Sequence, residues 1–360
     1  MKINQLHLPV IAEGLNLLKA YPGYKFGKTW SRPVSVNLLI TSRCNSKCVT
    51  CDSWKLTDHD RELSLDDFAR LAKDMRAMGI PIVTIGGGEP TLRKDLVEII
   101  RVFKSAGLNV QLTTNALTLR QPQRQAFYGS GLDRLTISVD SHLPKVYEKI
   151  RGVDGADNVI ENLHALLAEK PAHLAVDTNT VLCRDNQDTF LDTLDVLHEM
   201  GVPKLNLSAV TTYGGNFLMT ESKSGLAGIP IDRIDAIVEG LLDRKRRTGS
   251  INTSRAFIEG LRRYFRDPSK LVYPCFAGYL SMDIFQDGSV YGCGNIPSFG
   301  NVGDGSSRKI WESAKAEKPR RDMAEGRCPN CYVSCKIELA IAANPSHTAS
   351  FAIDRLKSIS

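Results

Sequence analysis

Residues 34–51 read VSVNLLITSRCNSKCVTC, and this stretch decides the fold. It opens with a short apolar run, Val34 to Ile40, that is typical of a buried β-strand. Cys44, Cys48 and Cys51 follow at once, with the spacing C-x3-C-x2-C. A strand that leads directly into metal-binding side chains predicts an α/β fold whose site lies at the carboxyl end of its strands.

Five more runs of this kind follow, and they alternate with longer segments of helical periodicity. This alternation is expected for parallel strands joined by crossover helices. Ser64 and Asp67 predict a capping box at the start of the first of those helices. Six strand–helix units fit either an open doubly wound sheet or a complete or partial barrel, and periodicity alone leaves the choice open. The later strands are predicted at Ile82–Ile85, Val110–Thr114, Arg134–Val139, Ala175–Leu182 and Lys204–Val210.

The pattern changes after about residue 270. Two short apolar runs, Met282–Phe285 and Ser289–Tyr291, flank Asp287-Gly288 and predict a hairpin, because Asp-Gly favours a tight turn. Five cysteines are concentrated around and after this hairpin. We therefore expect an N-terminal flap or helix at residues 1–33, a core at 34–250, a small cysteine-rich α+β domain at 251–345 and a tail at 346–360.

Composition excludes several function classes. The 360 residues carry a dispersed net charge of +6, which is too mild for a nucleic-acid-binding surface. No apolar stretch approaches the roughly 20 residues that span a bilayer, and no secretory leader is recognisable, so we expect no membrane insertion. Nine cysteines in such a chain indicate metal or redox chemistry in the cytoplasm rather than a disulfide framework.

The first cysteine group has a specific chemical interpretation. Three thiolates on one short loop bind three corners of an iron-sulfur cubane and leave the fourth iron without a protein ligand. A structural zinc ion would usually require a fourth Cys or His, and the nearest candidate is His59. The spacing therefore favours the iron-sulfur cluster.

With this loop after its first strand, the chain resembles the radical S-adenosylmethionine (SAM) superfamily. The resemblance implies a partial (β/α)6 TIM-like barrel and a 4Fe-4S cluster on Cys44, Cys48 and Cys51. It also implies that SAM chelates the open iron and is cleaved by one electron to methionine and a 5'-deoxyadenosyl radical. Thr50 stands where many members have an aromatic residue, so the adenine would pack on Trp54 or backbone; otherwise Trp54 anchors a surface loop.

Other strand ends supply candidate cofactor contacts. Gly86-Gly87-Gly88-Glu89-Pro90 resembles the family motif that holds the methionyl amino group, since glycines admit a ligand and Glu89 accepts from an ammonium. The resemblance implies that Arg151 pairs with the methionyl carboxylate, the alternative being a surface ion pair. Polar residues at the other strand ends either cap helices or line the ribose and carboxylate of SAM. The candidate cofactor residues are Gly87, Gly88, Glu89, Thr114, Asn115, Ser138, Asp140, Arg151 and Asn179.

The second cysteine group lies in a region too small to be held by its own core, so a metal centre would stabilise it. Its spacing also suits zinc. The region resembles the SPASM and twitch extensions of the same superfamily, and five cysteines suit one auxiliary 4Fe-4S cluster. The remaining cysteine, Cys183, is expected to be structural. The resemblance implies Cys275, Cys293, Cys328 and Cys331 as ligands, with Cys335 as a replacement.

The resemblance further implies an oxidoreductase in which the substrate radical passes its electron to the auxiliary cluster. A flavodoxin- or ferredoxin-type protein would supply the first electron. The 43 residues before Cys44 are fewer than the recognition domain of many peptide-modifying relatives, which favours dehydrogenation or bond formation on a small natural product. The chain ends without a Gly-Gly pair, which disfavours molybdopterin-precursor cyclisation.

Three alternatives remain. One is a peptide maturase that forms a thioether or carbon–carbon crosslink. The second is a redox-neutral radical SAM enzyme whose second cysteine group binds zinc and forms a lid. The third is not an enzyme but an iron-sulfur electron carrier or a zinc-stabilised binding module. A carrier would need neither the open iron nor the Gly-Gly-Glu loop.

Overall fold

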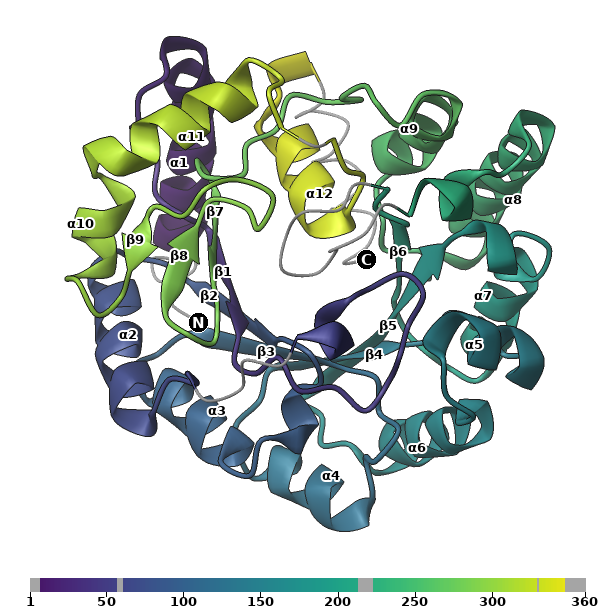
Figure 1. Cartoon of the computed structure of the whole chain (residues 1–360). Coiled ribbons are helices and arrows are strands. Elements are labelled where there is room, and N and C mark those ends of the chain that lie inside the picture. Colours follow the sequence, from purple (N-terminus) through teal and green to yellow (C-terminus); the bar gives the residue numbers. More distant parts are fainter. Residues whose placement is uncertain (1–6, 57–60, 213–222, 329, 347–360) are drawn as a thin grey trace.

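Within the described residues, nine strands form one curved sheet (Figure 1). The computed structural model describes residues 7–56, 61–212, 223–328 and 330–346. The strand order is β6-β5-β4-β3-β2-β1-β7-β8-β9, so the first six strands follow one another in parallel, as in a partial barrel and not in a doubly wound sheet. The strands are β1 (Ser35–Leu39), β2 (Ile82–Gly86), β3 (Asn109–Thr114), β4 (Arg134–Ser138), β5 (Ala175–Leu182), β6 (Leu205–Ala209), β7 (Ser281–Ile284), β8 (Ser289–Tyr291) and β9 (Gly300–Asn301).

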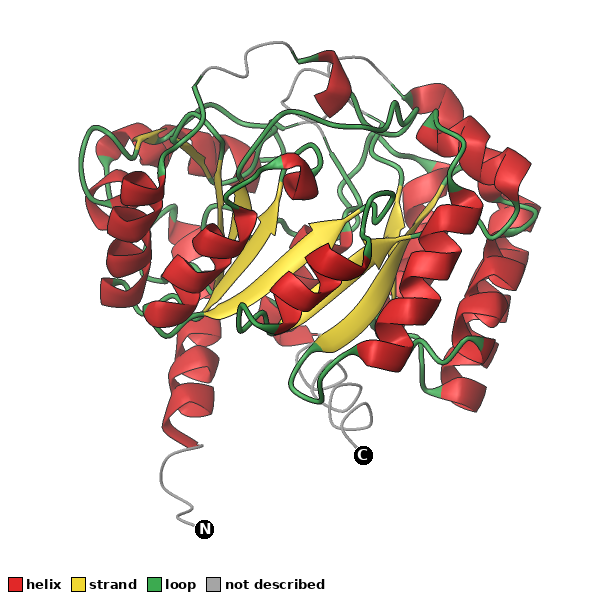
Figure 2. Cartoon of the chain, turned by 90° about the horizontal axis from the view of Figure 1, so that it is seen from below, coloured by secondary structure: helices red, strands yellow, loops and turns green. Residues whose placement is uncertain are grey.

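The helices that connect these strands surround the sheet (Figure 2). The predicted capping box is present at the start of α2, where the Ser64 hydroxyl accepts from the Asp67 amide and the Asp67 carboxylate accepts from the Ser64 amide. Phe68 and Met75 of this helix are fully buried against the sheet, and each such side chain contributes about 1.5 to 3 kcal/mol. The helices are α1 (His7–Phe26), α2 (Leu65–Ala77), α3 (Leu96–Ser105), α4 (Gln121–Tyr128), α5 (Pro144–Arg151), α6 (Ala156–Glu169), α7 (Phe190–Glu199), α8 (Ile231–Thr248), α9 (Arg255–Arg266), α10 (Ser307–Trp311), α11 (Ala314–Ala324) and α12 (Ser334–Ala343), with 3-10 turns at Ser53–Lys55, Pro90–Leu92, Arg184–Asn186 and Ser224–Ala227.

The cysteine-rich C-terminal part continues the sheet of the core. Strand β7 pairs in parallel with β1 and places Asp283 opposite Asn37. The predicted hairpin is confirmed, because β7 and β8 are antiparallel and Gly288 adopts the left-handed conformation with φ +83°. The proposed domain limits stay a prediction, and most of the expected tail, residues 347–360, lies outside the described residues.

Helix α12 lies across the open side of the partial barrel, between β7 and β6 (Figure 1). Its first residue, Ser334, shares a hydrogen bond of 2.9 Å with Ser208 of β6. Two residues later, the Lys336 ammonium donates to Asp283 of β7 at 2.7 Å. The helix therefore links the two strands that border the gap.

Helix α1, His7–Phe26, lies within the segment 1–33 that was expected to form a flap or helix. Tyr24 packs against Phe276 and Tyr279, with ring centroids 5.0 and 5.8 Å apart, and its hydroxyl donates to the Ala324 carbonyl at 3.0 Å. The helix thus contacts the cysteine-rich part of the chain. None of the described helices is both long and apolar enough to cross a membrane.

Candidate active site

The first cysteine loop is attached to the carboxyl end of α5. The amides of Lys47 and Val49 donate to the carbonyls of Arg151 and Ile150, both at 2.9 Å. The last carbonyls of a helix lack partners inside the helix, and here the loop supplies them. On the other side, the indole of Trp54 donates to the Cys51 carbonyl at 3.0 Å. Trp54 is therefore a loop anchor, while it also borders the cavity described below.

The three thiols of this loop lie in surroundings that disfavour thiolates in the absence of a cation. Burial raises the pKa of Cys44 to about 11 and that of Cys51 to about 12, and it also raises the pKa of Cys48. The thiols of Cys44 and Cys48 each raise the pKa of Cys51 further. A metal centre that supplies positive charge would stabilise all three thiolates. A donor set made only of sulfur suits an iron-sulfur cluster.

Among the described residues, no three Cys, His, Asp or Glu side chains are arranged to hold one ion. His59, the candidate fourth zinc ligand, lies outside the described residues.

The glycines after β2 are required by the backbone of the cysteine loop. A Cβ on Gly87, whose φ is +140°, would lie 2.4 Å from the Thr41 carbonyl oxygen, and one on Gly88 would lie 2.2 Å from that of Arg43. The Gly88 amide donates to the Thr41 carbonyl at 2.7 Å. Gly86 borders the cavity and has open space where its Cβ would be. The sequence suggested that a ligand approaches the backbone at these glycines. At Gly87 and Gly88, the backbone of residues 41–43 makes such a close approach.

Glu89 organises the polar residues around it. The buried carboxylate accepts from the Thr91 and Thr114 hydroxyls at 2.6 and 2.7 Å and from the Asn115 amide at 2.8 Å. Burial raises the pKa of Glu89, and these hydrogen bonds oppose the shift. The Asn115 side chain in turn donates to Asn45 in the cysteine loop at 2.7 Å. Glu89 and the cysteine loop therefore belong to one connected hydrogen-bond network.

Arg151 forms a buried ion pair, not the surface pair that the sequence left open. Its Nε lies 2.8 Å from the Asp140 carboxylate, and its Nη1 lies 4.0 Å from the Cys48 sulfur. The Arg151 guanidinium lowers the pKa of Cys48, against the larger effect of burial. The other oxygen of Asp140 accepts from the Val181 amide at 2.9 Å. The pair thus joins the end of α5 to the ends of β4 and β5 beside the first cysteine group.

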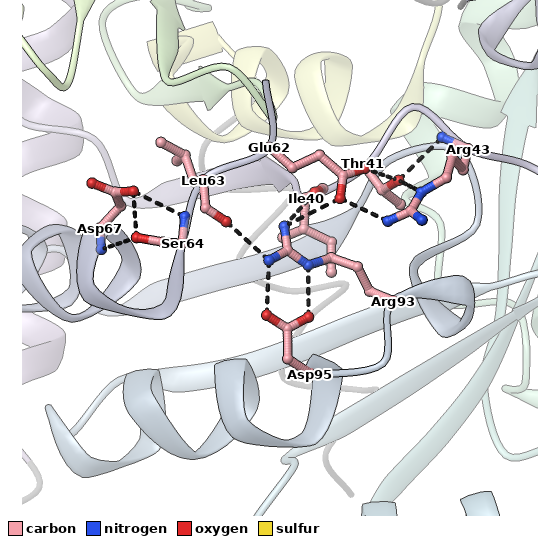
Figure 3. Close-up of polar contacts among 9 residues, drawn as sticks. All are labelled: Ile40, Thr41, Arg43, Glu62, Leu63, Ser64, Asp67, Arg93 and Asp95. Carbon is pink, nitrogen blue, oxygen red and sulfur yellow. Dashed lines mark hydrogen bonds and ion pairs between the residues drawn. The ribbon is translucent and has the colours of Figure 1, made fainter. Parts of the chain in front are cut away.

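A second polar network fixes the strand that leads into the cysteine loop (Figure 3). The buried Arg93 guanidinium forms a bidentate pair with Asp95 and donates to the Ile40 carbonyl, all within 2.9 Å. Glu62 accepts from Thr41 at 2.5 Å and pairs with Arg43 at 2.8 Å. Sequence reasoning missed this network, because its members are separated by up to 55 positions and match no motif.

All nine candidate cofactor residues and the first three cysteines line one cavity of about 350 Å³. The cavity lies where the strands end at their carboxyl edge, as expected. Sequence reasoning did not single out the residues that follow β6, although the predicted end of that strand at Val210 pointed to them. The lining residues that were missed include Ser53, Ser208, Ala209, Thr211 and Val333.

The second cysteine group is brought together by the fold. Burial raises the pKa of Cys328 to about 11 and of Cys331 to about 12, and the thiol of Cys275 raises both further. Cys275 likewise raises the pKa of Cys293 and Cys335, after the effect of burial. Cys275 is therefore within electrostatic range of the other four. The donor set is again all sulfur, which suits an iron-sulfur cluster. Cys183 is buried and belongs to neither group.

The segment that carries the second cysteine group reaches the cavity through Val333. Val333 lies between Cys331 and Cys335 in the sequence and lines the same cavity as Cys44, Cys48 and Cys51. Just before it, the Tyr332 carbonyl accepts from the Ala209 amide at the end of β6, at 3.4 Å. The segment that carries the second group thus forms part of the wall of the cavity that the first group lines.

A matched pair of glycines tests how the first loop is held. Gly152 and Gly249 end α5 and α8 with nearly equal φ, +65° and +64°. A Cβ on Gly152 would lie 2.4 Å from the Lys47 carbonyl oxygen, whereas one on Gly249 meets nothing within 4 Å. Both Gly→Ala variants should lose about 1 to 2 kcal/mol of stability from the left-handed conformation. Gly152→Ala alone should lose iron from the first loop. Equal iron contents in the two variants would contradict this attachment.

Two family models match the chain. That of the radical SAM superfamily matches residues 38–214, and that of the SPASM iron-sulfur cluster-binding domain matches residues 275–335. Together they cover the cavity-lining strands and both cysteine groups.

Curated relatives differ in how much of the chain they match. A PqqA peptide cyclase of Ruegeria pomeroyi is 27% identical over 340 residues, which are 88% of this chain and 86% of that protein. An AdoMet-dependent heme synthase of Methanosarcina barkeri is 24% identical over 81% of this chain and 86% of that protein. A GTP 3',8-cyclase of Lactiplantibacillus plantarum is 38% identical over 171 residues, which are 45% of this chain. The chain spans about half the length of that cyclase, 49%.

Solved structures share the fold at low sequence identity. Streptococcus suis SuiB bound to S-adenosylmethionine superposes with a TM-score of 0.66 at 17% identity, over 84% of this chain and 71% of that one. The anSMEcpe structure with bound AdoMet superposes with a TM-score of 0.60 at 17% identity, over 79% and 82%. Together with the cavity and its cysteines, the two family models establish that the chain belongs to the radical SAM superfamily, as an enzyme with a SPASM domain, and this membership implies S-adenosylmethionine and 4Fe-4S clusters as its cofactors.

Proposed function

We propose that this radical SAM enzyme oxidises a peptide by removing one hydrogen atom and then one electron, so that a new bond forms within the peptide. One observation carries the proposal: Val333, between Cys331 and Cys335, lines the cavity that also holds Cys44, Cys48 and Cys51. A substrate in this cavity would lie beside the first cysteine group and would contact the segment that carries Cys331 and Cys335. Bound S-adenosylmethionine, reduced through the first cluster by an external donor, supplies a 5'-deoxyadenosyl radical.

The residues of the chain divide into those that hold the first cluster and cofactor and those that accept the electron. Cys44, Cys48 and Cys51 would bind the first cluster, and the nine polar and glycine residues named above would surround the cofactor. The substrate gives one hydrogen atom to the deoxyadenosyl group and one electron to the cluster of the second cysteine group. A proton leaves to solvent, so the product is two hydrogens lighter than the substrate.

The choice of a peptide rests on the comparisons. The PqqA peptide cyclase matches this chain almost end to end, and the fold is shared with SuiB, a protein also crystallised with its precursor peptide SuiA. The sequence alone favoured a small molecule. That second candidate keeps one supporting observation, the match to an AdoMet-dependent heme synthase over 81% of the chain.

Protease sensitivity of the substrate distinguishes the two candidates. The reconstituted enzyme is incubated with SAM, dithionite and the low-molecular-weight fraction of its source cells, before and after digestion of that fraction with a nonspecific protease. The peptide proposal predicts that the fraction stimulates formation of 5'-deoxyadenosine and that digestion removes the stimulation. A product two hydrogens lighter should appear only with the undigested fraction.

The control is the same assay with Cys44, Cys48 and Cys51 replaced by alanine, which should form no deoxyadenosine with either fraction. Stimulation that survives digestion would overturn the peptide proposal in favour of a small molecule. A product with unchanged hydrogen content would overturn the oxidative step in favour of a redox-neutral reaction.

A further inference from the structure

A buried ammonium lies among the cysteines of the second group. Lys336 directly follows Cys335, and only 4% of its surface is exposed. Its Nζ donates to the Asp283 carboxylate at 2.7 Å and to the Ser281 hydroxyl at 2.9 Å, both in β7. Lysine is rarely buried to this extent unless it is paired.

The carboxylate of this pair reaches a second cysteine-bearing segment. One oxygen of Asp283 also accepts from the Asn37 side chain at 2.7 Å, and the other accepts from the Gly294 amide at 3.2 Å. Gly294 directly follows Cys293. The ion pair therefore touches the chain one residue after Cys335 and one residue after Cys293, on two sides of the second cysteine group.

The two charges of the pair do not act equally on the thiols. Burial raises the pKa of Cys275, Cys293 and Cys335, and at each of them Lys336 lowers the pKa more than Asp283 raises it. Of the two charges in the pair, the positive one therefore has the larger effect on the pKa of these three thiols. The ion pair with the Asp283 carboxylate at 2.7 Å favours the charged form of Lys336.

Stability alone does not account for such a pair. Taking two charges out of water costs several kcal/mol for each ion, and apolar residues of the same volume often serve equally well or better. The pair joins α12 to β7, yet an apolar contact would make that link without the cost of desolvation. A fixed charge beside the cysteines does what an apolar contact cannot.

We propose that Lys336 raises the reduction potential of the auxiliary cluster, and that Asp283 partly offsets it. The inference rests on the proposed function, in which this cluster accepts one electron from the substrate radical. The reduced cluster carries one more negative charge than the oxidised cluster, and a nearby buried cation stabilises that charge. Lys336 gains and loses no proton in this step. It is a positioning residue that favours electron transfer out of the substrate.

The test measures the midpoint potential of the auxiliary cluster by redox titration followed by electron paramagnetic resonance. The full chain carries Cys44, Cys48 and Cys51 as alanine, so that only the auxiliary cluster contributes a signal. Lys336→Met should lower the equilibrium constant for reduction at least tenfold, which is about 59 mV for a one-electron couple. Asp283→Asn should raise the potential above that of the parent, and Lys336→Arg should stay close to the parent.

Shifts of the midpoint potential in opposite directions in the two variants indicate an electrostatic effect. A structural role would shift both potentials the same way or release iron. If Lys336→Met loses its iron, the test rests on Asp283→Asn alone. A midpoint potential of Asp283→Asn that is not above that of the parent then overturns the inference. If neither variant changes the midpoint potential, the inference about Lys336 is overturned and the proposed function stands. A parent without any reducible cluster would overturn the proposed function, and this inference with it.

Discussion

Replacing Cys44, Cys48 and Cys51 together by alanine should lower the iron content of the reconstituted protein from about eight to about four atoms per chain, with labile sulfide falling in parallel. The two cysteine groups lie on separate elements, the first between β1 and the turn at Ser53–Lys55 and the second around β7 and α12. Loss of the first cluster should therefore leave the second in place. Iron, sulfide and zinc are measured on the same samples.

Cys183→Ala is the matched control for this experiment. Cys183 is fully buried but lies in neither cysteine group, so its replacement removes a thiol without removing a ligand. It should keep about eight irons while losing some stability to the small cavity that it creates. A wild-type chain with about four irons and one zinc, whose triple variant keeps only zinc, would show that the second group is a zinc-bound lid.

Arg151→Met should lower the free energy of unfolding by about 3 to 5 kcal/mol, because it leaves the Asp140 carboxylate buried without its cation. Asp140 is 1% exposed, and its distance of 2.8 Å from the Arg151 guanidinium leaves no room for bulk water. The first loop should also bind iron less well, since α5 carries both Arg151 and the carbonyls that hold Lys47 and Val49. Denaturant unfolding and iron content measure the two effects.

The double variant Arg151→Met, Asp140→Asn should recover most of the lost stability, because no uncompensated charge remains and the asparagine oxygen still accepts from the Val181 amide. Arg255→Met breaks an exposed pair with Glu259 and serves as the control, with almost no change expected. A double variant as unstable as Arg151→Met would show that packing of the arginine, rather than its charge, holds this corner of the site.

Local pattern was enough to predict strands β1 to β8 and a large part of the cavity lining from the sequence. Each strand was a short apolar run, and polar residues such as Asn115 and Asp140 followed the runs closely. Because the carboxyl ends of neighbouring parallel strands meet at one edge, residues far apart in sequence were correctly expected at one place.

Features that depend on long-range packing were not predictable in this way. No local signal in the sequence shows that β7 pairs with β1, because the paired residues Asn37 and Asp283 are separated along the chain by nearly the whole core. Lysine is usually a surface residue, and only the fold shows that Lys336, next to Cys335, is buried. Gly87 and Gly88 line the cavity, but nothing in the sequence indicated that residues 41–43, from another loop, also occupy the space of their missing Cβ atoms.

The most direct test of the account is whether the protein cleaves S-adenosylmethionine. Wild-type protein with both clusters reconstituted is reduced with dithionite in the presence of SAM, and 5'-deoxyadenosine and methionine are quantified together. The account predicts that both products form in equal amounts with the wild type and that neither forms with the variant lacking Cys44, Cys48 and Cys51. A wild type with a full complement of iron that forms no deoxyadenosine would contradict it, and would show that the chain carries electrons without radical chemistry.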